Sequence, residues 1–289
     1  MLKRMGELKR VTVVGAGTMG SQIALQTALS GRYDVALVDT VAGQLERARA
    51  QNRRLVERAV EKGRLTEDQA QQAIARIKDA SSVGEGVRDA DVVIEAVIEN
   101  FDAKKSVFED LGEHAPKDAI LASNSSTIAI SRLADFTGRP ELCCNLHFFH
   151  PVTVMQLCEV VRGPKTSDHT VATAMEFVRS INRTPVLLQK EIWGFIVNRV
   201  LFAASEEAMR LLEGGYASAE DIDVAVQKGL NWPMGPFHLL DFSGLDVFYG
   251  AMQDRHQLGE GPEAPEVLRK LVDAGRLGRK TGKGFFDYD

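Results

Sequence analysis

The sequence has 289 residues, of which 44% are hydrophobic and 26% are charged, and its formal net charge is −5. This length suits one large or two ordinary domains, each able to bury a substantial core. The acidic balance argues against a general nucleic-acid-binding protein, which usually presents a basic face, so we expect no nucleic-acid partner.

The sequence indicates neither a membrane segment nor a disulfide-stabilised fold. No apolar run approaches the roughly 18 residues that a membrane span requires, and the basic first ten residues precede only a short apolar run. We therefore expect no signal peptide and no membrane partner. The three cysteines, Cys143, Cys144 and Cys158, lie in apolar, strand-like runs. Their odd number predicts buried free thiols in a reducing compartment and a cytoplasmic protein.

The first half of the chain alternates short apolar runs with helix-favouring stretches. A helix is predicted over residues 20–29, and a long charged helical stretch from about 42 to 80 breaks near residues 62–64. The predicted strands are the short apolar runs at residues 11–14, 35–38, 91–96, 119–122 and 142–148. Strands that alternate with helices predict an α/β fold with a doubly wound parallel sheet, covered on both faces.

The pattern changes after about residue 190. Residues 195–212 have helical spacing, and Gly214 and Gly215 end that helix. Ser218 and Asp221 predict the beginning of a further helix. We therefore expect an α/β domain over residues 1–190 and an all-helical C-terminal domain over residues 191–289.

A glycine-rich turn follows the first predicted strand and opens the first helix. Its G-x-G-x-x-G pattern has Gly15 for a tight turn, Gly17 for close approach to a diphosphate, and Gly20 for packing of the helix on the strand. The N-terminus of the helix favours the anion. The sequence therefore predicts a Rossmann-like domain whose cofactor contacts include Gly15, Gly17, Thr18, Met19 and Gly20.

Asp39 ends the second predicted strand. A carboxylate at this position accepts both ribose hydroxyls of the cofactor and repels a 2′-phosphate, so we expect NAD rather than NADP. The alternatives are a glycine-rich turn without a ligand and a strand-end role for Asp39.

Further segments, in a consistent order, carry a family resemblance. They are EAVIENFDAK (95–104), ASNSS (122–126), HFFHP (147–151), MQLCE (155–159), GFIVNR (194–199) and PMGPF (233–237). From about Arg10 to Tyr288 the sequence resembles the 3-hydroxyacyl-CoA dehydrogenase family, in the short, single-function form that includes 3-hydroxybutyryl-CoA dehydrogenases. The resemblance implies NAD-dependent oxidation of a short L-3-hydroxyacyl-CoA to the 3-ketoacyl-CoA, such as 3-hydroxybutyryl-CoA to acetoacetyl-CoA, and the reverse reaction.

The resemblance also implies a catalytic His–Glu pair, which falls on His147 and Glu159. A neutral imidazole suits removal of the hydroxyl proton, and a carboxylate on its other nitrogen fixes the tautomer. Twelve residues separate the two, so we expect them on successive strands that lie side by side. Glu159 lies in an apolar run where an unpaired carboxylate is costly. The alternative for His147 is a core histidine.

Other site residues follow from the resemblance alone. Ser126 and Asn198 should hydrogen-bond the substrate oxygen, and Ser126 also borders the cofactor. Lys62 matches a position that contacts the CoA phosphates. Positions that line the NAD site are matched by Glu99, Lys104 and Lys280. For each residue the alternative is an ordinary cap or a solvated side chain without a ligand.

Three positions depart from the family pattern. His150 stands where the family usually has Asn, and we expect it to contact the nicotinamide end of NAD. Trp193 replaces a Pro, and Asn145 replaces a small residue. These changes bear on cofactor affinity and acyl-chain length more than on reaction type. We expect no metal at His147 and His150, because strand positions three apart face opposite sides.

The sequence is also consistent with two other functions. A dehydrogenase of a free hydroxy acid or sugar acid could share this scaffold and would differ near Lys62. A non-catalytic NAD-binding structural protein is disfavoured by the retained set of Ser126, His147, Glu159 and Asn198. Long apolar faces at residues 195–212 and 239–248 predict a homodimer.

Overall fold

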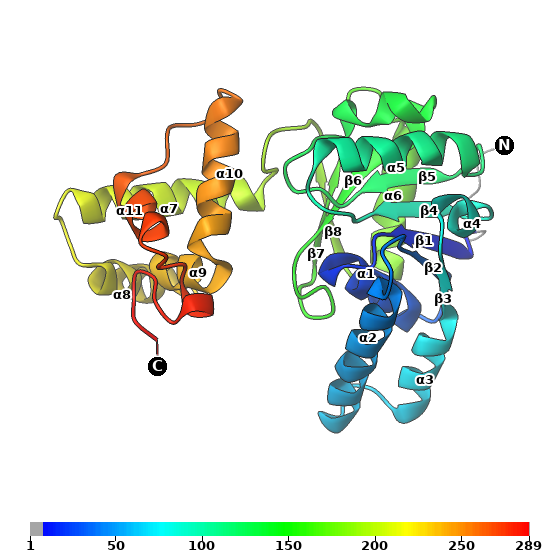
Figure 1. Ribbon diagram of the computed structural model, residues 1–289, viewed down its shortest axis with the longest axis horizontal. Coiled ribbons are helices and arrows are strands. Elements are labelled where there is room, and N and C mark those ends of the chain that lie inside the picture. Colours follow the sequence, from blue (N-terminus) through cyan, green and yellow to red (C-terminus); the bar gives the residue numbers. More distant parts are fainter. Residues whose placement is uncertain (1–7, 289) are drawn as a thin grey trace. The chain divides into compact units, whose positions relative to one another are not determined.

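The computed structural model describes residues 8–288 and is shown in Figure 1. The chain divides after Phe195 into two compact units, and each is described by itself.

The first unit is built on an eight-stranded sheet with the order β3-β2-β1-β4-β5-β6-β7-β8. All neighbouring strands are parallel except β6 and β7, which are antiparallel. The strands are β1 (Arg10–Val14), β2 (Asp34–Val38), β3 (Ile77–Ala80), β4 (Val92–Glu95), β5 (Ile120–Ser123), β6 (Cys143–Phe148), β7 (Leu157–Val161) and β8 (Thr184–Leu188). The chain order reverses between β1 and β4, the crevice where doubly wound sheets bind ligands.

Helices cover both faces of this sheet. The helices of the first unit are α1 (Thr18–Leu29), α2 (Gln44–Glu61), α3 (Glu67–Arg76), α4 (Val83–Val87), α5 (Phe101–His114) and α6 (Asp168–Ser180). One apolar core joins α1, α2, α3 and α6 to one face, and a second core joins α4 and α5 to the other. The predicted doubly wound α/β sheet is confirmed, because both faces of the strands are buried by helices.

The segment between β2 and β4 differs in part from the prediction. The expected break near residues 62–64 is confirmed, because α2 ends at Glu61 and Thr66 begins α3 with a capping box. The expected helix to residue 80 is wrong at its end. Residues Ile77–Ala80 form β3, a short strand that pairs only with β2.

The second unit is helical, as predicted. Its helices are α7 (Val197–Glu213), α8 (Ala219–Leu230), α9 (Pro236–Ser243), α10 (Leu245–Gln257) and α11 (Glu266–Asp273). Ser218 caps α8 by accepting a hydrogen bond from the Asp221 N–H, as its position predicts. The buried Asp241 carboxylate accepts hydrogen bonds from the N–H groups of Phe285 and Phe286, so it holds the C-terminal segment against α9.

None of the helices described between residues 8 and 288 combines the length and apolar character that crossing a bilayer requires.

Candidate active site

A histidine and a glutamate face each other across the antiparallel pair of strands. His147 on β6 lies directly opposite Glu159 on β7, and its Nδ1 is 2.7 Å from Glu159 Oε2. Only 6% of His147 and 0% of Glu159 is exposed. The twelve-residue spacing predicts this pairing on neighbouring strands, because opposed residues on a ladder project to the same face.

The contact with Glu159 decides how the imidazole can act. With Nδ1–H donated to the carboxylate, Nε2 is the ring nitrogen left to accept a proton. The rings of Phe149 and Phe195 lie beside the imidazole, with centroids at 4.5 and 5.5 Å. Phe195 is buried and has a φ of 50°. Sequence reasoning assigned no role to either phenylalanine, although both stand in the motifs that it singled out.

A tight turn after β5 carries Ser126. The Glu99 Oε1 atom accepts hydrogen bonds from the N–H groups of Ser126 and Thr127, both at 3.1 Å, and from the hydroxyls of Ser125 and Thr127. Burial acts to raise the pKa of Glu99, but the charge of Lys104 and the hydrogen bonds from Ser125 and Thr127 outweigh it and lower the pKa. Glu99 is therefore an ionised acceptor at neutral pH that fixes the turn around Ser126.

Asn145 holds the same loop from the sheet. Its Oδ1 accepts a hydrogen bond from the Ile130 N–H at 2.8 Å, and its Nδ2 donates to the carbonyls of Ile128 and Ser123. Asn145 is fully buried on β6, two residues before His147. This departure from the family pattern thus connects the strand of His147 to the loop of Ser126.

The glycine turn fits a dinucleotide. Gly17 is the N-cap of α1 without a side-chain cap, so backbone N–H groups at this helix end remain available to an anion. A Cβ atom on Gly17 would meet nothing within 4 Å, whereas a Cβ on Gly20 would lie 1.8 Å from the Gly15 carbonyl oxygen. Gly15 has a φ of 104°. In this turn Gly20 is therefore packed tightly against Gly15, whereas the space around Gly17 is open.

Asp39 lies at the carboxyl end of β2 beside this turn. Its carboxylate accepts hydrogen bonds from the N–H groups of Ala16 and Val41, both at 2.8 Å. Two apolar side chains past the strand ends were missed by sequence reasoning. Val41, after β2, is 62% exposed, and Ile98, after β4, is 73% exposed. These strands flank β1 on either side, and an apolar residue three positions past each strand end is the signal that could have found them.

Two family models together match nearly the whole chain. The model described as "3-hydroxyacyl-CoA dehydrogenase, NAD binding domain" matches residues 10–192, and "3-hydroxyacyl-CoA dehydrogenase, C-terminal domain" matches residues 194–288. The chain belongs to the 3-hydroxyacyl-CoA dehydrogenase family. This confirms the resemblance seen in the sequence motifs.

Relatives of this family match nearly the full chain. A 3-hydroxybutyryl-CoA dehydrogenase of Bradyrhizobium diazoefficiens is 40% identical over 283 residues, covering 97% of this chain and 96% of the relative. A probable 3-hydroxybutyryl-CoA dehydrogenase of Bacillus subtilis is 39% identical over 285 residues, with 98% of each covered. The crystal structure of (S)-3-hydroxybutyryl-CoA dehydrogenase from Ralstonia eutropha has a TM-score of 0.93 and 36% identity, covering 98% of this chain and 100% of that one.

The remaining residues that the family pattern singles out lie in different surroundings. His150 is exposed just after β6, and Lys62 is exposed at the end of α2. In the second unit, Asn198 is the second residue of α7, and the Lys280 ammonium pairs with the Asp246 carboxylate. Lys104 is only 1% exposed, which is unusual for a lysine.

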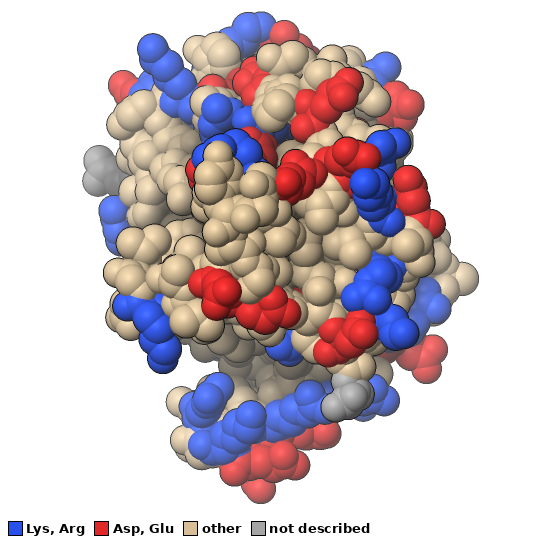
Figure 2. Space-filling view, turned by 90° about the vertical axis from the view of Figure 1, so that its left-hand side faces the viewer, with Lys and Arg blue, Asp and Glu red and all other residues tan. Residues whose placement is uncertain are grey.

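The α2–α3 hairpin carries Lys62 on a basic surface. Figure 2 shows Lys and Arg side chains in a row on this hairpin, the lowest part of that view. Exposed basic residues of α2 and its end include Arg54, Arg58 and Lys62, which follow one another at intervals of four. Such spacing places them along one side of the helix.

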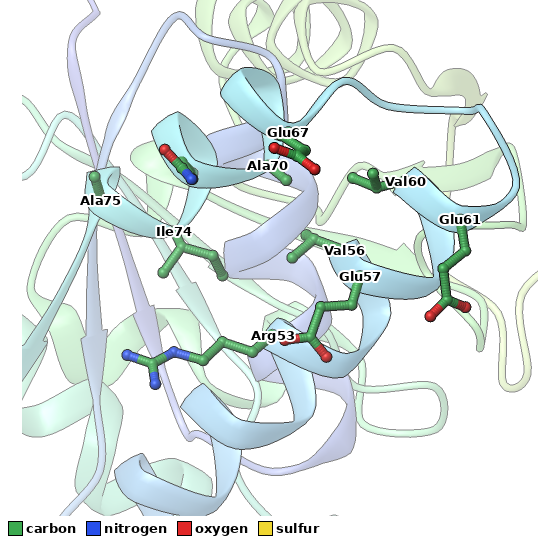
Figure 3. A pocket seen from close by; sticks show the side chains of 10 residues that line it. Arg53, Val56, Glu57, Val60, Glu61, Glu67, Ala70, Ile74 and Ala75 are labelled. Carbon is green, nitrogen blue, oxygen red and sulfur yellow. The ribbon is translucent and has the colours of Figure 1, made fainter.

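A groove of about 560 Å³ lies between the two helices of this hairpin (Figure 3). Val56 and Val60 of α2 face Ala70 and Ile74 of α3, and acidic residues stand at its edge. None of the site residues named above lines it. The groove is therefore distinct from the His147–Glu159 site.

The three cysteines are free and buried, as predicted. Burial raises the pKa of the Cys143 thiol to about 11, so this side chain is an un-ionised thiol at neutral pH. Among residues 8–288, no group of three His, Cys, Asp or Glu side chains is placed to hold a metal ion.

Proposed function

We propose that this protein interconverts a short L-3-hydroxyacyl-CoA and the 3-ketoacyl-CoA with NAD as its cofactor. The observation that carries the proposal is the buried His147–Glu159 pair at the carboxyl end of β6, in the same sheet as an NAD-type glycine turn. The relatives named 3-hydroxybutyryl-CoA dehydrogenases support a four-carbon acyl group.

The geometry of the His147–Glu159 pair indicates where the hydroxyl proton of the substrate goes. His147 Nε2 accepts the proton of the 3-hydroxyl group, and the imidazolium that forms keeps its Nδ1–H on Glu159. The carboxylate stabilises this charge in a site from which water is largely excluded. The Ser126 hydroxyl and the Asn198 amide hydrogen-bond the substrate oxygen. Bound NAD supplies the hydride acceptor, and in the reverse direction protonated His147 acts as the acid.

The cofactor is held by residues around the carboxyl ends of β1, β2 and β4. Backbone N–H groups at Gly17–Gly20 bind the diphosphate, and Asp39 binds the adenosine ribose. The exposed side chains of Val41 and Ile98 would supply apolar contacts to the adenine. Glu99, His150 and Lys280 complete the nicotinamide end.

The basic side of α2 binds the phosphates of CoA in this proposal. Arg58→Glu combined with Lys62→Glu should raise KM for acetoacetyl-CoA about tenfold, since two attractive charges become repulsive, and should leave kcat and the KM for NADH near wild type. Arg53→Glu, which reverses one charge on the other side of α2, is the control. Steady-state kinetics distinguish the two. An equal effect of both variants would mean that this side of α2 has no specific role.

The exposed apolar side chains of the second unit support a homodimer. They include Tyr216, Leu230 and Phe242, each more than 60% exposed. Sedimentation equilibrium should give twice the chain mass of 31.7 kDa. A single species at the mass of one chain would refute the dimer.

We also propose a cytoplasmic location, because the three cysteines are unpaired and thiols persist in reducing compartments.

The proposed substrate class is tested with purified protein by the loss of NADH absorbance. We expect rapid loss with acetoacetyl-CoA and little with free acetoacetate or with NADPH. Equal rates with the free acid would favour the hydroxy-acid alternative, and NADH binding without turnover on either substrate would favour a non-catalytic protein.

A further inference from the structure

Asn145 and His147 project from the same face of β6. Positions two apart on a strand point to the same side of the sheet. Both side chains are buried there, with exposed fractions of 0% and 6%. The imidazole contacts Glu159 on β7, whereas the Asn145 amide hydrogen-bonds the loop that follows β5. One short stretch of strand therefore carries the proposed base and, beside it, a polar group that holds the loop of Ser126.

The contacts of Asn145 lie on both sides of Ser126 in the sequence. Its Nδ2 donates to the carbonyl oxygen of Ser123, before Ser126, at 3.4 Å and to that of Ile128, after it, at 3.2 Å. Its Oδ1 accepts a hydrogen bond from the Ile130 N–H at 2.8 Å. The amide of Asn145 thus spans the loop and is bonded to the backbone before and after Ser126.

The Ile130 N–H is the donor that most needs this partner. It begins a short 3₁₀ turn (Ile130–Arg132), and the preceding residue, Ala129, offers no side-chain cap. The first N–H groups of a helical turn have no acceptor within the turn. Ile130 is only 1% exposed, and an unpaired donor in the interior is costly. The bond to Asn145 therefore fixes this end of the loop against β6.

Glu99 holds the middle of the same loop. Its Oε1 accepts the N–H groups of Ser126 and Thr127. The Glu99 side chain is 39% exposed, whereas Asn145 is fully buried and belongs to the strand of His147. Of these two supports, Asn145 is therefore the one that links the loop directly to the strand of the proposed base.

We propose that Asn145 is a positioning residue, which sets the place of the Ser126 hydroxyl relative to the His147 imidazole. The proposal rests on the proposed function in one respect, that Ser126 and His147 act on the same substrate oxygen. An alanine at this position could make none of the three hydrogen bonds. The competing account is that Asn145 serves stability alone.

A double-mutant cycle with Ser126 separates the two accounts. Asn145→Ala should lower kcat for acetoacetyl-CoA reduction about tenfold and leave the NADH Kd within about twofold of wild type, because a small misplacement of a substrate-binding group is costly in turnover. In a Ser126→Ala background the same substitution should lower kcat by less than about twofold, since the hydroxyl that it positions is absent. An unchanged kcat in Asn145→Ala would overturn the proposal, and so would a tenfold loss that persists in the Ser126→Ala background.

Asn52→Ala is the matched control. Asn52 is 2% exposed on α2, and its Nδ2 donates to the Ser21 carbonyl oxygen, so this variant also loses a buried asparagine and its hydrogen bond. Both variants should lower the melting temperature by about 5 °C, but only Asn145→Ala should lower kcat at a temperature where both are folded. An equal loss of kcat in both would assign the effect to destabilisation and contradict the proposal. If Asn145→Ala does not fold, Asn145→Ser takes its place in the cycle.

Hydrogen exchange tests the inference without turnover. In the apoprotein, Asn145→Ala should speed amide exchange roughly tenfold or more in peptides that cover residues 124–132, and should leave peptides of α6 unchanged. Unchanged exchange in the loop would refute the role of Asn145. If the wild type binds NADH but does not reduce acetoacetyl-CoA, the proposed function fails, and the exchange of the loop still decides whether Asn145 holds it in place.

Discussion

Replacing His147 by Gln should lower kcat for acetoacetyl-CoA reduction by about 10²–10⁴-fold, the usual contribution of a general acid–base group. Glutamine can still reach Glu159 through its amide, but it cannot carry the proton. The Kd for NADH should stay near the wild-type value, because the glycine turn and Asp39 lie on other strands. Stopped-flow kinetics and NADH titration measure the two quantities.

His169→Gln on α6 is the control for this experiment. It makes the same His-to-Gln substitution at a residue of α6 that is not part of the His147–Glu159 pair. We expect its kcat to equal that of the wild type. A His147→Gln variant with nearly full turnover would remove His147 from the mechanism, and the buried pair with Glu159 would then be a structural contact.

The second large effect is expected at the glycine turn. Gly17→Ala should fold normally, because an added Cβ meets nothing within 4 Å, yet should weaken NADH binding at least tenfold. The added methyl group would occupy the space through which the backbone approaches the diphosphate. Gly20→Ala should instead prevent stable folding, since its Cβ would lie 1.8 Å from the Gly15 carbonyl oxygen.

Thermal denaturation and NADH titration separate these two glycines. Gly229→Ala at the end of α8, where a Cβ also meets nothing within 4 Å, is the control for the substitution itself. A Gly17→Ala protein that binds NADH as tightly as the wild type would show that the diphosphate does not pass Gly17.

The sheet and the His147–Glu159 pair were predictable from the sequence for physical reasons. Short, nearly continuous apolar runs rich in Val and Ile form the buried strands β1, β2 and β4, so their pattern is clear. The β3 strand was not predictable, because Ile77–Ala80 is short, half of its residues are polar, and it pairs with a neighbouring strand on one side only. His147 and Glu159 were predictable as partners because a buried carboxylate needs one.

The support of the site was not predictable in the same way. Lys104 is followed by Lys105 and Ser106 in the amphipathic helix α5, a setting in which a lysine is usually solvated. Its burial arises from Glu95, whose depth depends on the strand pairing of β4 with both β1 and β5. The contacts of Asn145 with the Ser126 loop likewise depend on the pairing of β5 with β6. Such partners come from neighbouring strands, and no local pattern encodes them.

The central claim is that this protein moves a hydride between the nicotinamide and C3 of the acyl group. The most direct measurement uses NADH fully deuterated at C4 together with acetoacetyl-CoA, followed by mass spectrometry of the product. We predict 3-hydroxybutyryl-CoA that carries one deuterium, located at C3. Product without deuterium, or no product from protein that binds NADH, would contradict the account.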